Sequence, residues 1–164
     1  MDPVVVRPCS PDDLSRLERS AVPADALAHH RERCAMQQRG EARYLLGWSG
    51  GTVVGRVTLL HASKYAGVRE RGDLWEMNAL EALPQGRGVG TLLITAAEEL
   101  ARVDGTGVLG LAVEPSNTGA LRLYGRLSYR DWGHGMVLDE WTERDSAGRG
   151  CASTGRRATT CSSP

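Results

Sequence analysis

The chain has 164 residues, with 20 basic and 20 acidic side chains and no formal net charge. This length suits one domain with its own core, and the balanced charge gives no basic surface for a nucleic-acid partner. The sequence shows no apolar run that could cross a membrane, no secretory leader, and four cysteines without metal or disulfide spacing, so we expect a cytoplasmic protein without membrane partner or bound metal.

The first part of the chain predicts one strand and two helices. A strand is expected at residues 4–7, and Ser10-Pro11-Asp12-Asp13 then combines an N-cap, a first-turn proline and two acids. A second helix is expected over residues 23–38. It carries His29 and His30, which cannot share one helix face and which we expect to be solvated.

A hairpin and a third strand follow. Residues 42–48 and 52–60 alternate around a Gly-Gly turn, which predicts two antiparallel strands. Residues 61–72 are polar and contain glycine, so we expect a loop there. The next strand is expected at residues 73–83, directly before a proline.

Residues 85–91 are the most informative segment. Gly86, Gly88 and Gly90 alternate with Arg87 and Val89 at the start of a long amphipathic helix, expected over residues 86–103. The first amides of a helix lack partners and carry the positive end of its dipole, and glycine allows a ligand to approach the backbone. The segment therefore predicts a cradle for a phosphate or diphosphate group.

Three phosphate-binding patterns compete for this segment. A Walker loop needs a lysine directly before Thr91, where this chain has Gly90. A dinucleotide fingerprint needs G-x-G-x-x-G, whereas these glycines are spaced G-x-G-x-G. The third pattern, Q/R-x-x-G-x-G/A, is matched from Gln85 to Gly90. A glycine-rich turn that only caps the helix is the alternative.

A second block lies downstream at residues 108–129. It predicts a strand at 108–113 and a helix at 117–127 with Asn117 as N-cap, and it carries Ala120 and Leu123-Tyr124. Together the two blocks resemble the GCN5-related N-acetyltransferases (GNAT), whose acyl-CoA signature is the third pattern above. The resemblance covers about residues 4–141. Ser128 departs from it, because the family usually has glycine there.

The resemblance implies an α/β fold of the α+β type. In this GNAT fold, a mixed and mostly antiparallel twisted sheet is splayed between strands four and five and flanked by helices. Short strands at residues 129–132 and 136–141 complete the expected order β-α-α-β-β-β-α-β-α-β-β. We expect a domain over residues 1–143 and a disordered tail over 144–164, since the tail has no large apolar residue to offset its ordering entropy.

The same resemblance implies an acetyl-CoA-dependent N-acetyltransferase in which a primary amine attacks the bound thioester directly. The pantetheine arm enters the splayed gap, held by Asn117 and by main-chain amides of Ala82 and Leu83. The family usually has two more residues between the proline and Gln85. The amides that match the family are therefore either those of Ala82 and Leu83 or those two positions away. The remaining cofactor-binding residues are expected to hold the diphosphate: Gln85, Gly86, Arg87, Gly88, Val89, Gly90 and Thr91.

Two side chains are candidates for proton transfer. Tyr124 resembles the tyrosine that protonates the leaving thiolate, and a packing role in the core is the alternative. Glu76 is the candidate base, since strand alternation places it on one face with Leu80, while Glu81 points to the opposite face. Glu114, a water relay, and a plain salt bridge for Glu76 remain alternatives.

The acceptor is expected to be a small-molecule amine, such as an amino acid, a polyamine or an antibiotic, and a protein amine is the other possibility. The rival function is a non-catalytic acyl-CoA-binding module, either a sensor or a degenerate paralogue. Association as a homodimer is left open, because family members pair their sheets in several ways.

Overall fold

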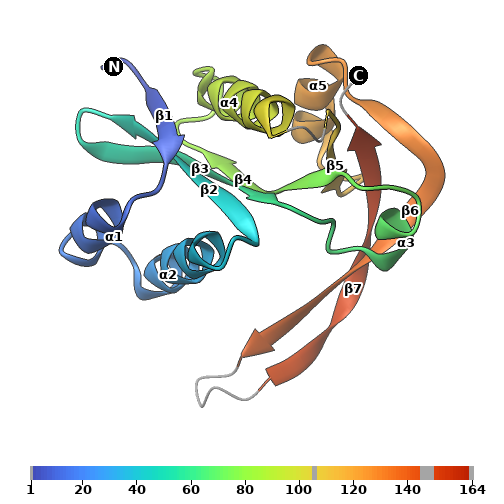
Figure 1. Ribbon diagram of the computed structural model, residues 1–164, viewed down its shortest axis with the longest axis horizontal. Coiled ribbons are helices and arrows are strands. Elements are labelled where there is room, and N and C mark those ends of the chain that lie inside the picture. Colours follow the sequence, from blue (N-terminus) through green and yellow to red (C-terminus); the bar gives the residue numbers. More distant parts are fainter. Residues whose placement is uncertain (1, 105–106, 145–149, 163–164) are drawn as a thin grey trace.

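A computed structural model describes residues 2–104, 107–144 and 150–162. They form one seven-stranded sheet in the order β1-β2-β3-β4-β5-β7-β6, with helices on both faces (Figure 1). Neighbouring strands pair antiparallel except β4 and β5, which are parallel, so the expected mixed and mostly antiparallel sheet is confirmed. The elements are β1 (Val5–Pro8), α1 (Pro11–Glu18), α2 (Ala24–Gln38), β2 (Ala42–Ser49), β3 (Thr52–Leu60), α3 (Ala66–Arg69), β4 (Trp75–Ala82), α4 (Val89–Val103), β5 (Leu109–Val113), α5 (Thr118–Arg126), β6 (Arg130–Arg144) and β7 (Gly150–Ser162).

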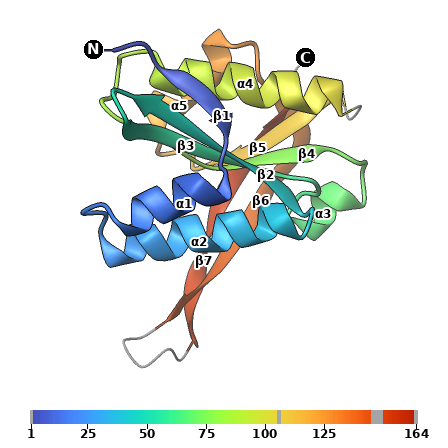
Figure 2. The same cartoon turned by 60° about the vertical axis from the view of Figure 1, so that its left-hand side comes forward.

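The main core lies between the sheet and α4. Figure 2 shows α4 crossing one face of the sheet while α1 and α2 lie against the other. Apolar residues recur along α4 at helical spacing, so one stripe packs on the inner strands. Leu93, Ile94 and Ala97 of this stripe are fully buried, and Tyr124 of α5 joins the same cluster.

The opposite face is held by polar contacts as well as by apolar ones. Ser10 caps α1 in a reciprocal capping box with Asp13, as the sequence indicates. Arg7 pairs with the same carboxylate. The free thiols of Cys9 and Cys34 lie 3.0 Å apart, which joins the end of β1 to α2 although the sequence spacing gave no sign of this contact.

The sheet splays between β4 and β5. Their register runs from Trp75 opposite Leu109 to Met77 opposite Leu111, and β4 then continues to Ala82 alongside β3. The departure coincides with Ala79, whose φ of 53° is left-handed, and with a register shift against β3. A bulge thus turns β4 away from β5 and opens the sheet.

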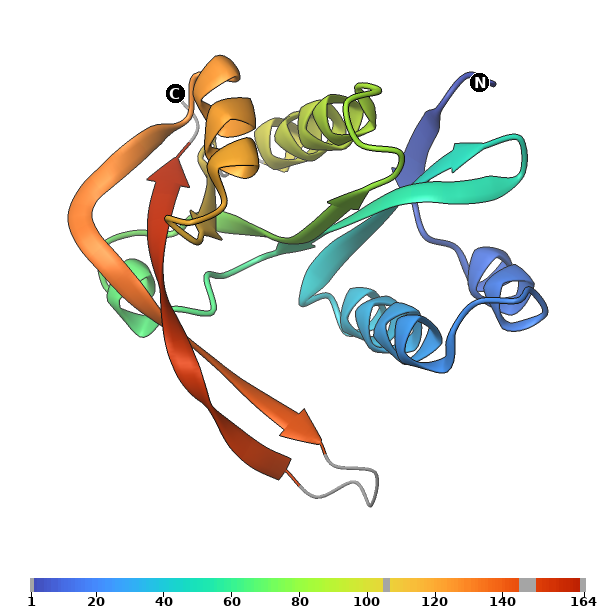
Figure 3. The ribbon, with the colours of Figure 1, turned by 180° about the vertical axis from the view of Figure 1, so that it is seen from behind.

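The C-terminal region differs from the expectation. The interpretation of residues 144–164 as a disordered tail does not agree with β7, which spans Gly150–Ser162 and pairs with both β5 and β6. Main-chain pairing on both sides stabilises this strand, whereas the prediction considered only apolar burial. Figure 3 shows β6 and β7 as a long two-stranded arm; β6 is one strand where two short ones were expected. Residues 145–149 and 163–164 lie outside the described part.

Two smaller expectations also need correction. The segment 61–72 is not loop throughout, because α3 forms one helical turn within it. His30 is buried at 4% exposure, and His29 is half-buried. Both rings lie near Tyr44, with the His30 Nδ1 atom 2.7 Å from its hydroxyl, since neighbouring helix positions can flank one large side chain.

Candidate active site

A cavity of about 830 Å³ opens where β4 and β5 separate. Its walls come from the second half of β4, the glycine-rich loop with the start of α4, the end of β5, and α5. Eight of the ten predicted cofactor-binding residues line it: Ala82, Gln85, Gly86, Gly88, Val89, Gly90, Thr91 and Asn117.

The glycine-rich loop gives the cavity an anion-binding end. Gly86 and Gly88 have φ values of 74° and 79°, a left-handed conformation that favours glycine. Gly88 is the N-cap of α4 and supplies no side-chain hydrogen bond to the first turn. The amides of Gly90 and Thr91 therefore remain available to an anion at the positive end of the helix dipole, which fits a diphosphate.

Two predicted cofactor residues lie elsewhere. The Leu83 amide donates to the Val54 carbonyl at 2.8 Å, and its side chain is 56% exposed. This amide is therefore engaged in the pairing between β3 and the end of β4. Arg87 is exposed and does not form part of the cavity wall.

Helix α5 contributes two predicted residues. The Asn117 side chain accepts a hydrogen bond from the Ala120 amide at 3.1 Å, so its predicted N-cap role is confirmed. Tyr124 lies further along α5, is 8% exposed, and lines the same cavity. Its ring packs against that of Tyr129 with centroids 5.6 Å apart. Both the catalytic and the packing interpretations of Tyr124 are compatible with this position.

Glu76 is buried at 2% exposure but does not line the cavity. Its Oε2 atom accepts hydrogen bonds from the Ser63 hydroxyl at 2.5 Å and the Lys64 amide at 3.1 Å. Burial raises the pKa of Glu76, and these hydrogen bonds offset part of the shift. The carboxyl group thus has the raised proton affinity expected of a base, yet the cavity wall includes its neighbours Met77 and Asn78 and not Glu76 itself.

The predicted facing of β4 is wrong beyond Asn78. Met77 and Leu80 both pack on the α4 side, although three positions separate them. Asn78 contacts Arg33 of α2, and Glu81 pairs with Arg56 at 2.5 Å on that same side. The extra residue at the bulge inverts the alternation, so Glu81 shares a face with Glu76 and Leu80 does not.

Several residues of the site went unnoticed in the sequence. Lys64 and Tyr65 line the cavity from the segment before α3, where no motif marks them. Asn78 also lines it, and the available signal was an amide in the middle of an otherwise apolar strand. Glu114, an alternative candidate base, lies on the wall at the end of β5.

The described residues hold no group of three His, Cys, Asp or Glu side chains suited to a metal ion. Among the described helices, none has both the length and the apolar character needed to cross a bilayer.

Comparisons with solved structures show the same fold at low identity. An N-acetyltransferase from Staphylococcus aureus Mu50 superposes with a TM-score of 0.65 at 13% identity, covering 98% of each chain. The ribosomal-protein-alanine N-acetyltransferase from Brucella melitensis gives 0.64 at 17% identity, covering 96% of this chain and 98% of the other. A GNAT family acetyltransferase from Elizabethkingia anophelis, solved with acetyl-CoA bound, gives 0.62 at 15% identity, covering 99% of each.

No curated protein sequence matches the chain significantly. A family model described as the acetyltransferase (GNAT) family does match, over residues 12–129. That match includes most of α1, the glycine-rich loop, and α5 with Tyr124. The chain therefore belongs to the acetyltransferase (GNAT) family.

Proposed function

We propose that this protein is an acetyl-CoA-dependent N-acetyltransferase that acetylates the primary amine of a small molecule. The observation that carries this proposal is a single cavity with an amide cradle at one end and a buried tyrosine along its wall. The resemblance to a structure with acetyl-CoA bound supports the choice of cofactor.

The proposed roles follow from position. The amides of Gly90 and Thr91 bind the diphosphate, and Asn117 holds the pantetheine arm. When bound, acetyl-CoA supplies the activated acetyl group. Holding the amine and the thioester together accounts for much of the rate enhancement in such a direct transfer. Tyr124, on the cavity wall, donates a proton to the leaving thiolate.

The amine must lose a proton before or during its attack. Glu76 is the base in our proposal, acting through water, because its carboxyl group is not on the cavity wall. Glu114 is the alternative, since it lies on the wall at the opposite side of the opening. A Glu76→Gln variant should move the acidic limb of the pH–rate profile, whereas Glu114→Gln should leave that limb in place.

The test is a measurement of thiol release from acetyl-CoA across a panel of amines, together with calorimetric titration of CoA and acetyl-CoA. We expect cofactor binding, and thiol release that depends on at least one primary amine. Binding without turnover of any amine would support the rival, a non-catalytic acyl-CoA-binding module. Absence of binding in a folded sample would contradict both.

A further inference from the structure

A group of cationic and polar side chains lies on the α2 side of β4, opposite α4. Arg33 of α2 donates from Nη2 to the Asn78 Oδ1 atom at 3.2 Å and from Nη1 to the Met36 sulfur at 3.4 Å. Nearby Arg56 of β3 is paired with Glu81. No carboxylate of the described residues forms a salt bridge with Arg33, so its charge has neutral hydrogen-bond partners only.

Burial makes this unpaired charge costly. Burial lowers the pKa of Arg33, the nearby Glu32 carboxylate and Tyr44 act in the opposite direction, and the positive charge of Arg56 adds to the lowering. Burial also lowers the pKa of His29 to about 4, with further contributions from Arg56 and Arg33, so His29 is neutral at pH 7. The cluster therefore carries positive charge in a half-buried setting where an anion would be favoured.

Polar atoms in this cluster also lack partners. The Nε atoms of Arg33 and Arg56, the Nε2 atom of His29 and the hydroxyl of Thr58 are all buried without a hydrogen bond. Thr58 is fully buried. Buried polar groups are normally satisfied, so these atoms are open to a hydrogen bond from a water molecule or a ligand group.

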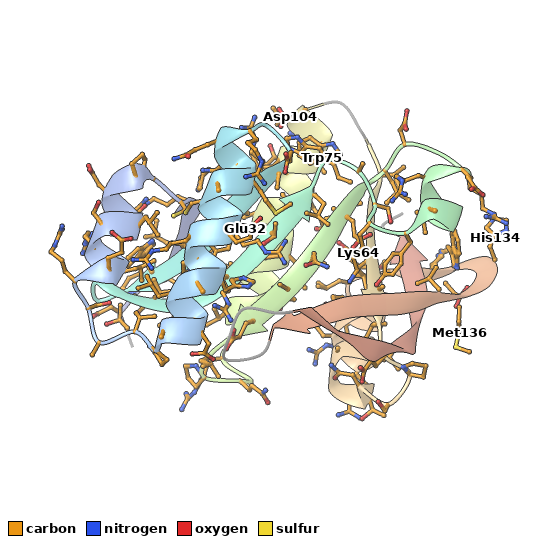
Figure 4. The ribbon with its side chains drawn as sticks, turned by 90° about the horizontal axis from the view of Figure 1, so that it is seen from below. Glu32, Lys64, Trp75, Asp104, His134 and Met136 are labelled. Atoms are coloured by element: carbon orange, nitrogen blue, oxygen red, sulfur yellow. The ribbon has the colours of Figure 1, made fainter. Side chains whose placement is uncertain are left out.

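Asn78 connects the cluster to the cavity. It lines the cavity where β4 leaves β5, and it accepts the hydrogen bond from Arg33. Figure 4 views the sheet from this side, with α2 and its Glu32 at one side of β4 and Lys64 at the other. Arg33 is not itself on the cavity wall. It is joined to that wall by its hydrogen bond to Asn78, on the face of β4 opposite the α4 core.

We propose that Arg33, held by Asn78, binds a carboxylate group of the acceptor, so that the preferred substrate is an amino acid or a similar amine that carries a carboxylate. This inference rests on the proposed acetyl transfer. Guanidinium and carboxylate form a charge-assisted, often bidentate pair. Polycationic amines are disfavoured at the same place, because the positive charge of Arg33 repels them.

The experiment compares kcat/KM for amino acids with kcat/KM for the corresponding decarboxylated amines and amino acid amides, alongside spermidine. Wild type should prefer the carboxylate-bearing amine by about tenfold or more, since charge-assisted hydrogen bonds are at stake. Arg33→Gln should raise KM for amino acids by about tenfold while leaving KM for the amides unchanged. Arg33→Lys should retain part of the preference, because lysine keeps the positive charge but lacks the planar guanidinium group that binds both carboxylate oxygens.

Arg31→Gln is the matched control, since Arg31 lies on the same helix but pairs at the surface with Glu18. It should behave as wild type, and all variants should bind CoA equally by calorimetry. A preference for spermidine, or an Arg33→Gln variant with unchanged selectivity, would overturn the inference alone. Should Arg33→Gln fail to fold, the wild-type preference and the Arg33→Lys variant decide. Thiol release with none of these amines would overturn the proposed function and this inference with it.

Discussion

The two faces of β4 are built in different ways. On the α4 side, the site consists of backbone: left-handed Gly86 and Gly88, a helix start without a side-chain cap, and an apolar stripe beneath it. On the α2 side, it consists of side chains that meet from different elements, such as Arg33 with Asn78 and Arg56 with Glu81. Under the proposed function, the backbone site binds the cofactor and the side-chain site binds the acceptor.

The strongest test of this contrast adds a charge to the backbone site and compares it with a neutral residue of the same shape. Gly88→Asp places a carboxylate at the start of α4, where no atom lies within 4 Å of the added Cβ. The left-handed φ of 79° strains any residue other than glycine there, so we expect a loss of about 1 kcal/mol in folding stability. We expect the Kd for CoA to rise by about 100-fold, because the carboxylate repels the diphosphate.

Gly88→Asn is the control for this change. Asparagine has the same shape and the same backbone strain, and it carries no charge. Calorimetry should therefore find much weaker CoA binding for the aspartate variant than for the asparagine variant. Equal affinities would show that the diphosphate does not lie at this loop.

Tyr124→Phe tests whether the Tyr124 hydroxyl, on the cavity wall, protonates the leaving thiolate. Removing the hydroxyl should lower kcat by about 10- to 100-fold, as expected for the loss of a general acid. The Kd for CoA should stay nearly unchanged, because the phenyl ring keeps its place against Tyr129. Stopped-flow or steady-state thiol release measures the effect, and an unchanged kcat would leave Tyr124 with a packing role.

The contrast between the faces also explains what the sequence could predict. The glycine-rich loop and the Asn117 cap could be predicted because each depends on residues adjacent in the chain, whereas Tyr124 was predicted from the family resemblance. The facing of Leu80 and Glu81 was mispredicted because one left-handed residue, Ala79, inverts the alternation, and alanine gives no sign of that conformation. Strand alternation is reliable only where no bulge interrupts it.

The side-chain contacts on the α2 side of the sheet could not be predicted from local sequence patterns, for a different reason. Arg33 and Asn78 are 45 positions apart, and their contact exists only once α2 packs on β2 and the strands from β2 to β4 pair. The adjacent histidines were likewise predicted to be solvated, because nothing in their local sequence shows that both rings lie beside Tyr44 of β2. β7 was missed because its support is main-chain pairing with β5 and β6, which composition does not report.

Asp13 should make the α2 side sensitive to acid. Its buried carboxylate accepts from Arg7 and from the Ser10 amide and hydroxyl, and the Arg7 contact is the main reason that its pKa falls to about 2. A lowered pKa in the folded state gives stability that is present above the unfolded value of about 4 and is lost between about pH 4 and pH 2.

We therefore expect Asp13→Asn to lower the free energy of unfolding by about 2 kcal/mol at pH 7, through loss of the ion pair and the capping box. Urea denaturation at pH 7 and at pH 3 measures both effects, and the difference from wild type should shrink at pH 3. Asp12→Asn, an exposed acid in the same helical turn, is the control. An equal loss in both variants would point to the helix dipole instead of the pairing with Arg7.

The smallest expected effect concerns Ser128, at the end of α5 behind the cavity. Its φ of 68° is left-handed, which explains in physical terms why glycine is usual at this position of the family. Because Ser128 is exposed, Ser128→Gly removes strain without opening a cavity and should raise the free energy of unfolding by about 0.5–1 kcal/mol. Ser128→Ala keeps the Cβ and should give no gain. Tyr129 follows Ser128 directly and packs on Tyr124. Both the urea denaturation curve and kcat should therefore be measured for each Ser128 variant. A gain in stability with unchanged kcat would mean that this strain is a local cost of the helix end and does not serve to position Tyr124.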